Sequence, residues 1–219
     1  LAHDVGEKRE CKYGLDNVII QPGGKPTIWK FLATVMNQGD EVLYPNPGYP
    51  IYESQVYYQG GIPVPYKYIQ TKNGFDIDID SLTKSISDRT KVLIINNYQN
   101  PLSASSSFEE LKSLAEIANK YNLWVLSDDA YFEIRYSDDD PKSIVNLPGM
   151  RQRTVILYTF SKKFAMTGWR IGASIGPVPV IKQMARFNIN DESCTNHFIQ
   201  HALASVSYTH LTLPTKCWG

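Results

Sequence analysis

The chain has 219 residues, a length typical of one large domain or of one domain with part of another. It carries 22 basic and 22 acidic side chains, and this balance lacks the excess positive charge that binding to a nucleic acid backbone requires. Hydrophobic residues make up 42% of the chain and charged residues 20%, which argues against disorder and favours a globular protein with a sizeable core.

The cysteines and the apolar runs indicate where the protein works. Cys11, Cys194 and Cys217 are too few and too far apart for a disulfide framework or a Cys-x-x-Cys metal site. No apolar run approaches the ~18 residues of a membrane span. No signal peptide is recognisable at Leu1, where the chain begins without a Met. We therefore expect a cytoplasmic protein with no metal site, no membrane partner and no nucleic acid partner.

Short apolar runs alternate with amphipathic stretches along the chain, which is typical of βαβ units. Thr27–Met36 has apolar side chains at helical spacing, and Ser107 followed by Glu110 is a capping box for a helix that runs to about Tyr121. The expected fold is α/β, a three-layer sandwich with a mainly parallel sheet between helices. Its strands are predicted at Asn17–Gln21, Glu41–Tyr44, Ile62–Tyr66, Lys91–Asn96, Leu123–Ser127, Thr154–Thr159 and Arg170–Ile175.

The loops that follow the predicted strands carry most of the residues with chemical potential. In open α/β sheets, ligands bind beyond the carboxyl ends of the strands, so polar residues at these positions are site candidates. Five loops qualify: Gly23-Gly24-Lys25, Asn46-Pro47-Gly48-Tyr49, Asn97 to Pro101, Asp128-Asp129-Ala130-Tyr131, and Thr159 to Lys162.

The first three loops have an ordinary structural interpretation beside the functional one. Gly24 and Lys25 at the start of a helix either bind a phosphate through backbone N–H groups or form a turn. Tyr49 either stacks on a flat ligand or packs within a turn set by its neighbouring Pro and Gly residues. Asn100 precedes a proline, which favours an extended conformation in an irregular loop. Taken singly, each turn interpretation is the stronger one.

The last two loops contain the charged candidates. Asp128 at the end of a buried strand is either solvated or paired with a cationic ligand atom, because an unpaired buried carboxylate is costly. Lys162 is either an exposed basic residue or a desolvated amine with a lowered pKa that attacks carbonyl groups. Arg170 lies eight residues further on and has the planar guanidinium that binds a phosphate or a carboxylate through two hydrogen bonds.

Taken together, these loops resemble the class I/II aminotransferases of the aspartate aminotransferase type, which are fold-type I enzymes dependent on pyridoxal 5'-phosphate (PLP). The resemblance covers about residues 10 to 205. It rests on five motifs in the family's order: Gly23-Gly24-Lys25, Pro45-Asn46-Pro47-Gly48-Tyr49-Pro50, Asn100-Pro101, Asp128-Asp129-Ala130-Tyr131, and Ser161-Lys162 through Gly168-Trp169-Arg170-Ile171-Gly172.

The resemblance implies a role for each candidate. Lys162 is similar to the lysine that holds PLP as a Schiff base and then moves the proton of the reaction. Asp128 corresponds to the acid that pairs with the protonated ring nitrogen, and Tyr49 to the residue that stacks on the ring. Tyr131 and Asn100 would donate hydrogen bonds to the 3-oxygen of the ring. The phosphate would be held by Gly24, Lys25, Thr159 and Arg170.

The resemblance also implies the activity and the extent of the domain. We expect residues 1–205 to be the PLP-binding large domain, cut at both ends, of an enzyme that transfers an amino group from an amino acid to a 2-oxo acid as a homodimer. Residues 206–219 resemble translated sequencing-adapter sequence, so a non-native tail is expected there. Two departures from the family are Leu102-Ser103, where Thr-Gly is usual, and Asp129, where Glu is common.

Three alternatives remain open at the level of the sequence. The same fold supports a PLP-dependent β-lyase, and it also occurs as the ligand-sensing domain of a transcriptional regulator. An α/β protein that binds phosphate without any PLP chemistry is the plainest of the three.

Overall fold

A seven-stranded sheet forms the centre of the molecule, in a computed structural model that describes residues 1–72, 74–134, 136 and 142–212. The strand order is β1-β9-β8-β7-β6-β2-β3. The strands are β1 (Val18–Gln21), β2 (Glu41–Pro45), β3 (Ile62–Tyr66), β6 (Thr90–Asn96), β7 (Trp124–Asp128), β8 (Thr154–Thr159) and β9 (Gly172–Ile175).

The sheet is mainly parallel, as expected. Strands β3, β2, β6, β7 and β8 pair in parallel, and β9 is antiparallel to both of its neighbours, β8 and β1. The parallel strands therefore end at the same edge of the sheet, which brings the loops after β2, β6, β7 and β8 together.

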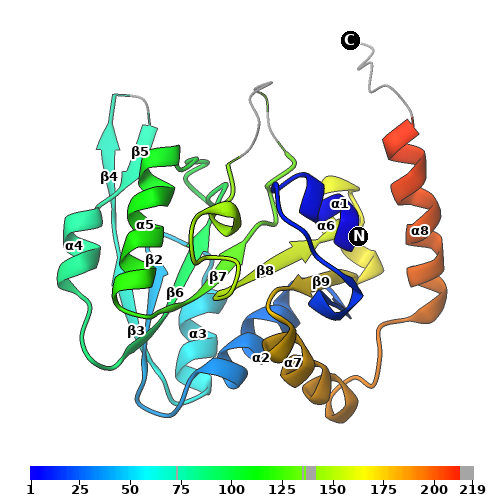
Figure 1. The fold of residues 1–219 in the computed structure, drawn as a ribbon, viewed down its shortest axis with the longest axis horizontal. Coiled ribbons are helices and arrows are strands. Elements are labelled where there is room, and N and C mark those ends of the chain that lie inside the picture. Colours follow the sequence, from blue (N-terminus) through cyan, green and yellow to red (C-terminus); the bar gives the residue numbers. More distant parts are fainter. Residues whose placement is uncertain (73, 135, 137–141, 213–219) are drawn as a thin grey trace.

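Helices cover both faces of the sheet, which confirms the three-layer sandwich (Figure 1). Leu93 of β6 packs in a core with helix α5 (Phe108–Lys120), while its neighbours Val92 and Ile94 pack in a second core with helices α2 (Lys25–Val35), α3 (Ile51–Tyr58) and α7 (Val178–Asn190). Successive side chains of a strand point to opposite faces, so a strand buried on both faces needs a continuous apolar run. That is the pattern from which the sequence predicted β6.

Ser107 caps α5 as predicted, but the reciprocal half of the capping box is not formed, because Oε1 of Glu110 accepts from the backbone N–H of Ile77 instead. The hydroxyl of Ser107 accepts a hydrogen bond from the backbone N–H of Glu110 at 3.1 Å, and the helix begins at Phe108. The apolar face of α5 is buried against the sheet through Leu111, Leu114, Ala115 and Ala118. This face sets the position of the helix on the sheet.

Most predicted boundaries are met to within one residue, and three differences from the sequence prediction are larger. Helix α2 begins at Lys25 instead of Thr27, because Pro26 fits the first turn of a helix. Strand β9 begins at Gly172 because Arg170 has a left-handed backbone, with φ of 50°. The hairpin of β4 (Tyr68–Thr71) and β5 (Gly74–Ile77) was not predicted, since its strands alternate weakly, although Asn73-Gly74 is a hairpin signal in the sequence.

The remaining elements are short except for the last helix. They are α1 (Ala2–Glu7), α4 (Ile79–Lys84), α6 (Phe160–Lys163), α8 (His197–Thr212) and the 3₁₀ turns η1 (Leu15–Asn17), η2 (Ile144–Asn146) and η3 (Thr167–Trp169). The expected tail 206–219 thus begins within α8, and its residues 213–219 lie outside the described part of the chain, so the tail stays a prediction. No helix within the described ranges has the length and apolar character to cross a membrane.

A glycine in β9 allows the first loop of the site to approach the sheet. A Cβ on Gly172 would lie 2.7 Å from the backbone carbon and oxygen of Gly23 and 2.7 Å from the carbonyl oxygen of Tyr158. We expect Gly172→Ala to lower the unfolding free energy by about 2 kcal/mol, because backbone atoms must move apart. Urea unfolding measures this change.

Gly168→Ala is the matched control for that substitution. No heavy atom lies within 4 Å of a Cβ built on Gly168, so this variant should unfold like the unsubstituted protein. Equal losses of stability in the two variants would contradict the packing argument for Gly172.

Candidate active site

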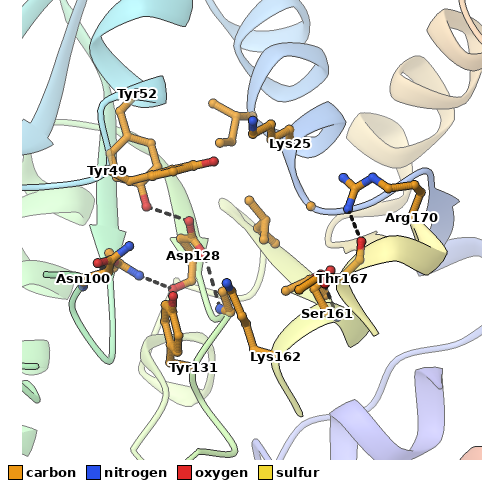
Figure 2. Close-up of a pocket in the computed structure, with 16 residues that line it drawn as sticks. Lys25, Tyr49, Tyr52, Asn100, Asp128, Tyr131, Ser161, Lys162, Thr167 and Arg170 are labelled. Carbon is orange, nitrogen blue, oxygen red and sulfur yellow. Dashed lines mark hydrogen bonds between the residues drawn. The ribbon is translucent and has the colours of Figure 1, made fainter. Parts of the chain in front are cut away.

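A cavity of about 450 Å³ lies at the carboxyl ends of the parallel strands (Figure 2). All nine residues that the sequence singled out line this one cavity: Gly24, Lys25, Tyr49, Asn100, Asp128, Tyr131, Thr159, Lys162 and Arg170. They come from five loops spread over almost 150 residues of chain, so the parallel sheet is what gathers them.

One corner of the cavity is suited to an anion. Gly24 precedes the first turn of α2, and a Cβ at Gly24 would come within 2.8 Å of Cδ2 of Leu157 and 3.6 Å of Cβ of Thr159. A glycine at this position therefore lets the N-terminus of α2 lie this close to the end of β8 without displacing the side chain of Leu157. The free backbone N–H groups of this first turn, with the helix dipole, favour a negatively charged group there.

Arg170 closes the same corner from the other side. Gly23 has a φ of 99°, and a Cβ at this residue would lie 2.4 Å from Nη2 of Arg170, so the guanidinium rests directly against the glycine. Nη1 of Arg170 donates to the carbonyl oxygen of Thr167 at 2.7 Å, which holds the guanidinium in place. The side chain remains exposed toward the cavity and can bind a phosphate or a carboxylate.

The deepest charged group of the cavity is Asp128, the last residue of β7. Its carboxylate is buried and accepts hydrogen bonds from the Tyr52 hydroxyl at 2.6 Å and from the backbone N–H of Ala130 at 3.2 Å. Burial raises the pKa of Asp128 to about 6, and the hydrogen bond from Tyr52 opposes this rise. Among the described residues, none forms an ion pair with Asp128, so a cationic ligand atom would find an uncompensated acid there.

Lys162 and Tyr131 lie together near Asp128. Nζ of Lys162 is 5.6 Å from the centroid of the Tyr131 ring, and Figure 2 shows both side chains directed toward the space beside Asp128. Lys162 is exposed, so of the two alternatives that the sequence left open the structure favours the exposed residue. It lies in α6, a single turn of four residues that directly follows β8, and it still lines the cavity.

The loop with the unusual Leu102-Ser103 pair is held by side chain amides. The side chain of Asn96 bridges two loops, since its Nδ2 donates to the carbonyl oxygen of Asp128 at 3.0 Å and its Oδ1 accepts from the backbone N–H of Asn100 at 2.8 Å. Oε1 of Gln99 accepts from the N–H of Leu102 at 2.7 Å. The departure from Thr-Gly therefore leaves Asn100 firmly placed on the cavity wall.

Sequence reasoning missed several residues of the cavity, above all Tyr52. Tyr52 lies three residues after Tyr49, and the two rings meet edge to face with centroids 5.7 Å apart. This i, i+3 spacing at a helix start was a signal that both side chains share a face. Other lining residues that were not singled out are Ile28, Asn96, Ala130, Leu157, Ser161 and Thr167.

The donor set fits one kind of molecule. An anion corner, an aromatic wall, a buried acid without a cation and a primary amine would together bind a phosphorylated aromatic ring with a basic nitrogen and a carbonyl group. PLP has each of these features. The described part of the chain holds no cluster of three or more side chains suited to a metal ion.

The fold and the cavity thus define the large domain of a fold-type I PLP enzyme. The family model for class I and II aminotransferases matches residues 1–211, and the chain belongs to this family, whose members use PLP as cofactor.

Individual relatives agree with this assignment. The aromatic-amino-acid aminotransferase 2 of Thermococcus litoralis is 35% identical over 209 residues, which are 93% of this chain and 54% of that protein. The aspartate aminotransferase of Pyrococcus abyssi is 35% identical, over 85% of this chain and 48% of its own length. The crystal structure of an aromatic aminotransferase from Pyrococcus horikoshii has a TM-score of 0.89 at 32% identity, covering 93% of this chain and 55% of that one. The chain therefore spans about half the length of these relatives.

The buried carboxylate makes stability depend on pH. Because the pKa of Asp128 rises from 3.8 to about 6 on folding, the folded protein retains a proton that the unfolded chain has lost in this window, so stability falls as the pH rises through it. Asp128→Asn should remove this component, which amounts to about 2 kcal/mol between pH 4 and pH 7. Urea unfolding of the PLP-free protein at pH 4, 5, 6 and 7 measures it.

Asp76→Asn on the exposed β5 strand provides the control, because that side chain is exposed. Its stability should follow the unsubstituted protein at every pH. An Asp128→Asn variant that shows the same pH dependence as Asp76→Asn would contradict the assignment.

Proposed function

We propose that this chain is the PLP-binding part of an aminotransferase that transfers an amino group from an amino acid to a 2-oxo acid. The observation that carries this proposal is Asp128, a buried acid without a cationic partner among the described residues, in the same cavity as the amine of Lys162 and the anion corner at Gly24 and Arg170. No observation favours the β-lyase or the ligand-sensing alternative over transamination.

The anion corner would fix the cofactor. The backbone N–H groups of Gly24 and Lys25, the hydroxyl of Thr159 and the guanidinium of Arg170 would bind the phosphate. Asp128 and Arg170 lie on different sides of the cavity (Figure 2), so the site would have two anchoring points, one for the phosphate and one for the ring nitrogen. Tyr49 on the cavity wall would pack against the ring and exclude water from it.

Asp128 would act on the ring nitrogen. Its carboxylate would hold a proton on that nitrogen, and the positive charge gained there would in turn compensate the buried acid. PLP, when bound, supplies an electron-withdrawing ring that makes the Cα proton of the substrate acidic. The role of Asp128 is to keep the ring in the protonated form in which this withdrawal is strongest.

Lys162 would first hold the cofactor through Nζ and then move a proton. The amine of Lys162 would also serve as the base that takes up the proton from the substrate Cα. Lys162 is exposed and lines the cavity, so its side chain has room for this movement. Tyr131 and Asn100 would donate hydrogen bonds to the ring oxygen beside the reacting carbon.

For the substrates and the assembly, we propose only general classes. The relatives are named for aromatic amino acids and for aspartate, so their names do not define one amino donor for this chain. We propose amino acid and 2-oxo acid substrates, a homodimer for the whole protein and a cytoplasmic location.

Absorbance spectroscopy tests the role of Lys162. Adding PLP to the protein should produce a visible band that neither free PLP nor the protein shows alone, and Lys162→Arg should lack this band because a guanidinium does not condense with the PLP aldehyde. Lys163→Arg is the matched control. It keeps the charge beside Glu133 and should retain the band.

The outcomes separate the proposal from its competitors. A band that survives in Lys162→Arg and disappears in Lys163→Arg would show that Lys163, and not Lys162, condenses with PLP. No band in any of the three proteins, although they are folded by circular dichroism, would leave only a phosphate-binding domain.

A further inference from the structure

A buried arginine from the N-terminal segment reaches the back of the Asp128 loop. Arg9 follows α1, is 1% exposed, and donates from Nε at 2.9 Å and from Nη2 at 2.7 Å to the same oxygen, Oδ2 of Asp129. Its guanidinium also lies 3.8 Å above the ring centroid of Phe132. The two partners are 120 residues apart in the chain, so tertiary structure alone creates this contact.

Asp129 in turn secures the loop that carries Asp128 and Tyr131. Its second carboxylate oxygen, Oδ1, accepts from the hydroxyl of Ser127 at 2.6 Å. Its backbone N–H donates to the carbonyl oxygen of Leu157 in β8 at 3.1 Å, and its own carbonyl accepts from Phe132 at 3.1 Å. The turn is thus fixed at Asp129 on four sides, and Arg9 supplies the only ion pair that the described residues make with it.

Two buried carboxylates that are neighbours in sequence pose an electrostatic problem. Asp128 and Asp129 are each 5% exposed, and like charges this close suppress the ionisation of one another. Without a nearby cation, burial and this mutual repulsion together keep a proton on at least one of the two acids. The pair can carry two negative charges near neutral pH only if a positive group compensates one of them, and Arg9 compensates Asp129.

The other titratable groups around Asp128 and Asp129 do not supply a positive charge that could replace that of Arg9. Burial raises the pKa values of Tyr13, Tyr52, Tyr158 and Cys11, so these groups stay neutral near pH 7. Lys8 and Lys163 are engaged with one oxygen of Glu133, and Lys162 lies over Tyr131 on the cavity side.

We propose that Arg9 is a positioning residue of the active site: by compensating Asp129 and packing on Phe132, it leaves Asp128 as the acid that is free to bind the ring nitrogen of PLP. This inference rests on the proposed function. Arg9 itself lines no part of the cavity and touches no reacting atom, so it acts only through Asp129 and the turn 128–132.

The test compares three variants: Arg9→Gln, Arg9→Lys, and the double variant Arg9→Gln/Asp129→Asn. Arg9→Gln leaves Asp129 buried without a cation, Arg9→Lys retains the charge, and the double variant removes both charges while keeping groups that form hydrogen bonds. Two readouts are needed. Carbon NMR of labelled aspartate follows carboxyl titration in the PLP-free protein, and fluorescence titration gives the PLP dissociation constant from pH 6 to pH 8.5.

In Arg9→Gln we expect one proton to remain on the Asp128 and Asp129 pair at pH 7, and the PLP affinity at pH 7 to fall by about tenfold or more and to recover toward high pH. Arg9→Lys should titrate like the unsubstituted protein. The double variant should recover PLP affinity to within about threefold, because Asp128 then has no charged neighbour. A merely structural role for Arg9 would not give this recovery.

Each failure has a distinct meaning. An Arg9→Gln protein whose carboxyls titrate as in the unsubstituted protein would overturn the proposal, as would a folded double variant that binds PLP as poorly as the single variant. A double variant that does not fold would also overturn it, since the pair would then serve the fold alone. If Arg9→Gln itself does not fold, recovery in the double variant still supports the proposal.

The carboxyl titration also separates this inference from the proposed function. If the unsubstituted protein binds no PLP, the proposed function fails. The titration of the PLP-free protein then still decides whether Arg9 controls the charge on the two acids.

Discussion

The burial of the Asp128 carboxylate at the end of β7 is the constraint on which the site depends. A carboxylate in this position is unfavourable unless its surroundings compensate it, and the chain supplies hydrogen bonds from Tyr52 and Ala130 but no ion pair within the described residues. The neighbouring Asp129, in contrast, is fully paired with Arg9 and Ser127. Two adjacent acids thus have different surroundings: Asp129 anchors the loop, and Asp128 has no cationic partner among the described residues, which is why we propose that it binds the ring nitrogen of PLP.

The opposite end of the cavity depends on the absence of side chains. Gly23, Gly24 and Gly172 lie where a Cβ would collide with a guanidinium, with Leu157 or with the backbone. Their close approach brings the N-terminus of α2 to the end of β8 and seats Arg170 against the loop. A positive corner and a buried negative group therefore face each other across one cavity, a distribution of charge that complements a molecule with a phosphate at one end and a protonated nitrogen in its ring.

Much of the fold could be predicted from the chain because the inner strands of its sheet are buried on both faces and require nearly unbroken apolar runs. The edge strands β1 and β3 are only partly buried, yet their short apolar runs were also recognised, so all seven strands were found to within about two residues. The β4 and β5 hairpin escaped because its strands are short and partly exposed, so their pattern is weak. The start of β9 was misplaced because Arg170 has a left-handed backbone. The sequence gives no sign of this conformation, which is uncommon for residues other than glycine.

The sequence by itself determined the class of fold, the five loops and nine of the residues that line the cavity, because motifs and strand patterns can be read along the chain. Only the tertiary structure showed that Tyr52 donates to Asp128, that Asn96 connects the Asp128 and Asn100 loops, and that Lys162 is exposed. It alone also joined Arg9 to Asp129 across 120 residues. These contacts depend on which side chains meet when the sheet assembles, and the ionisation of a buried group depends on those neighbours rather than on its position in the chain.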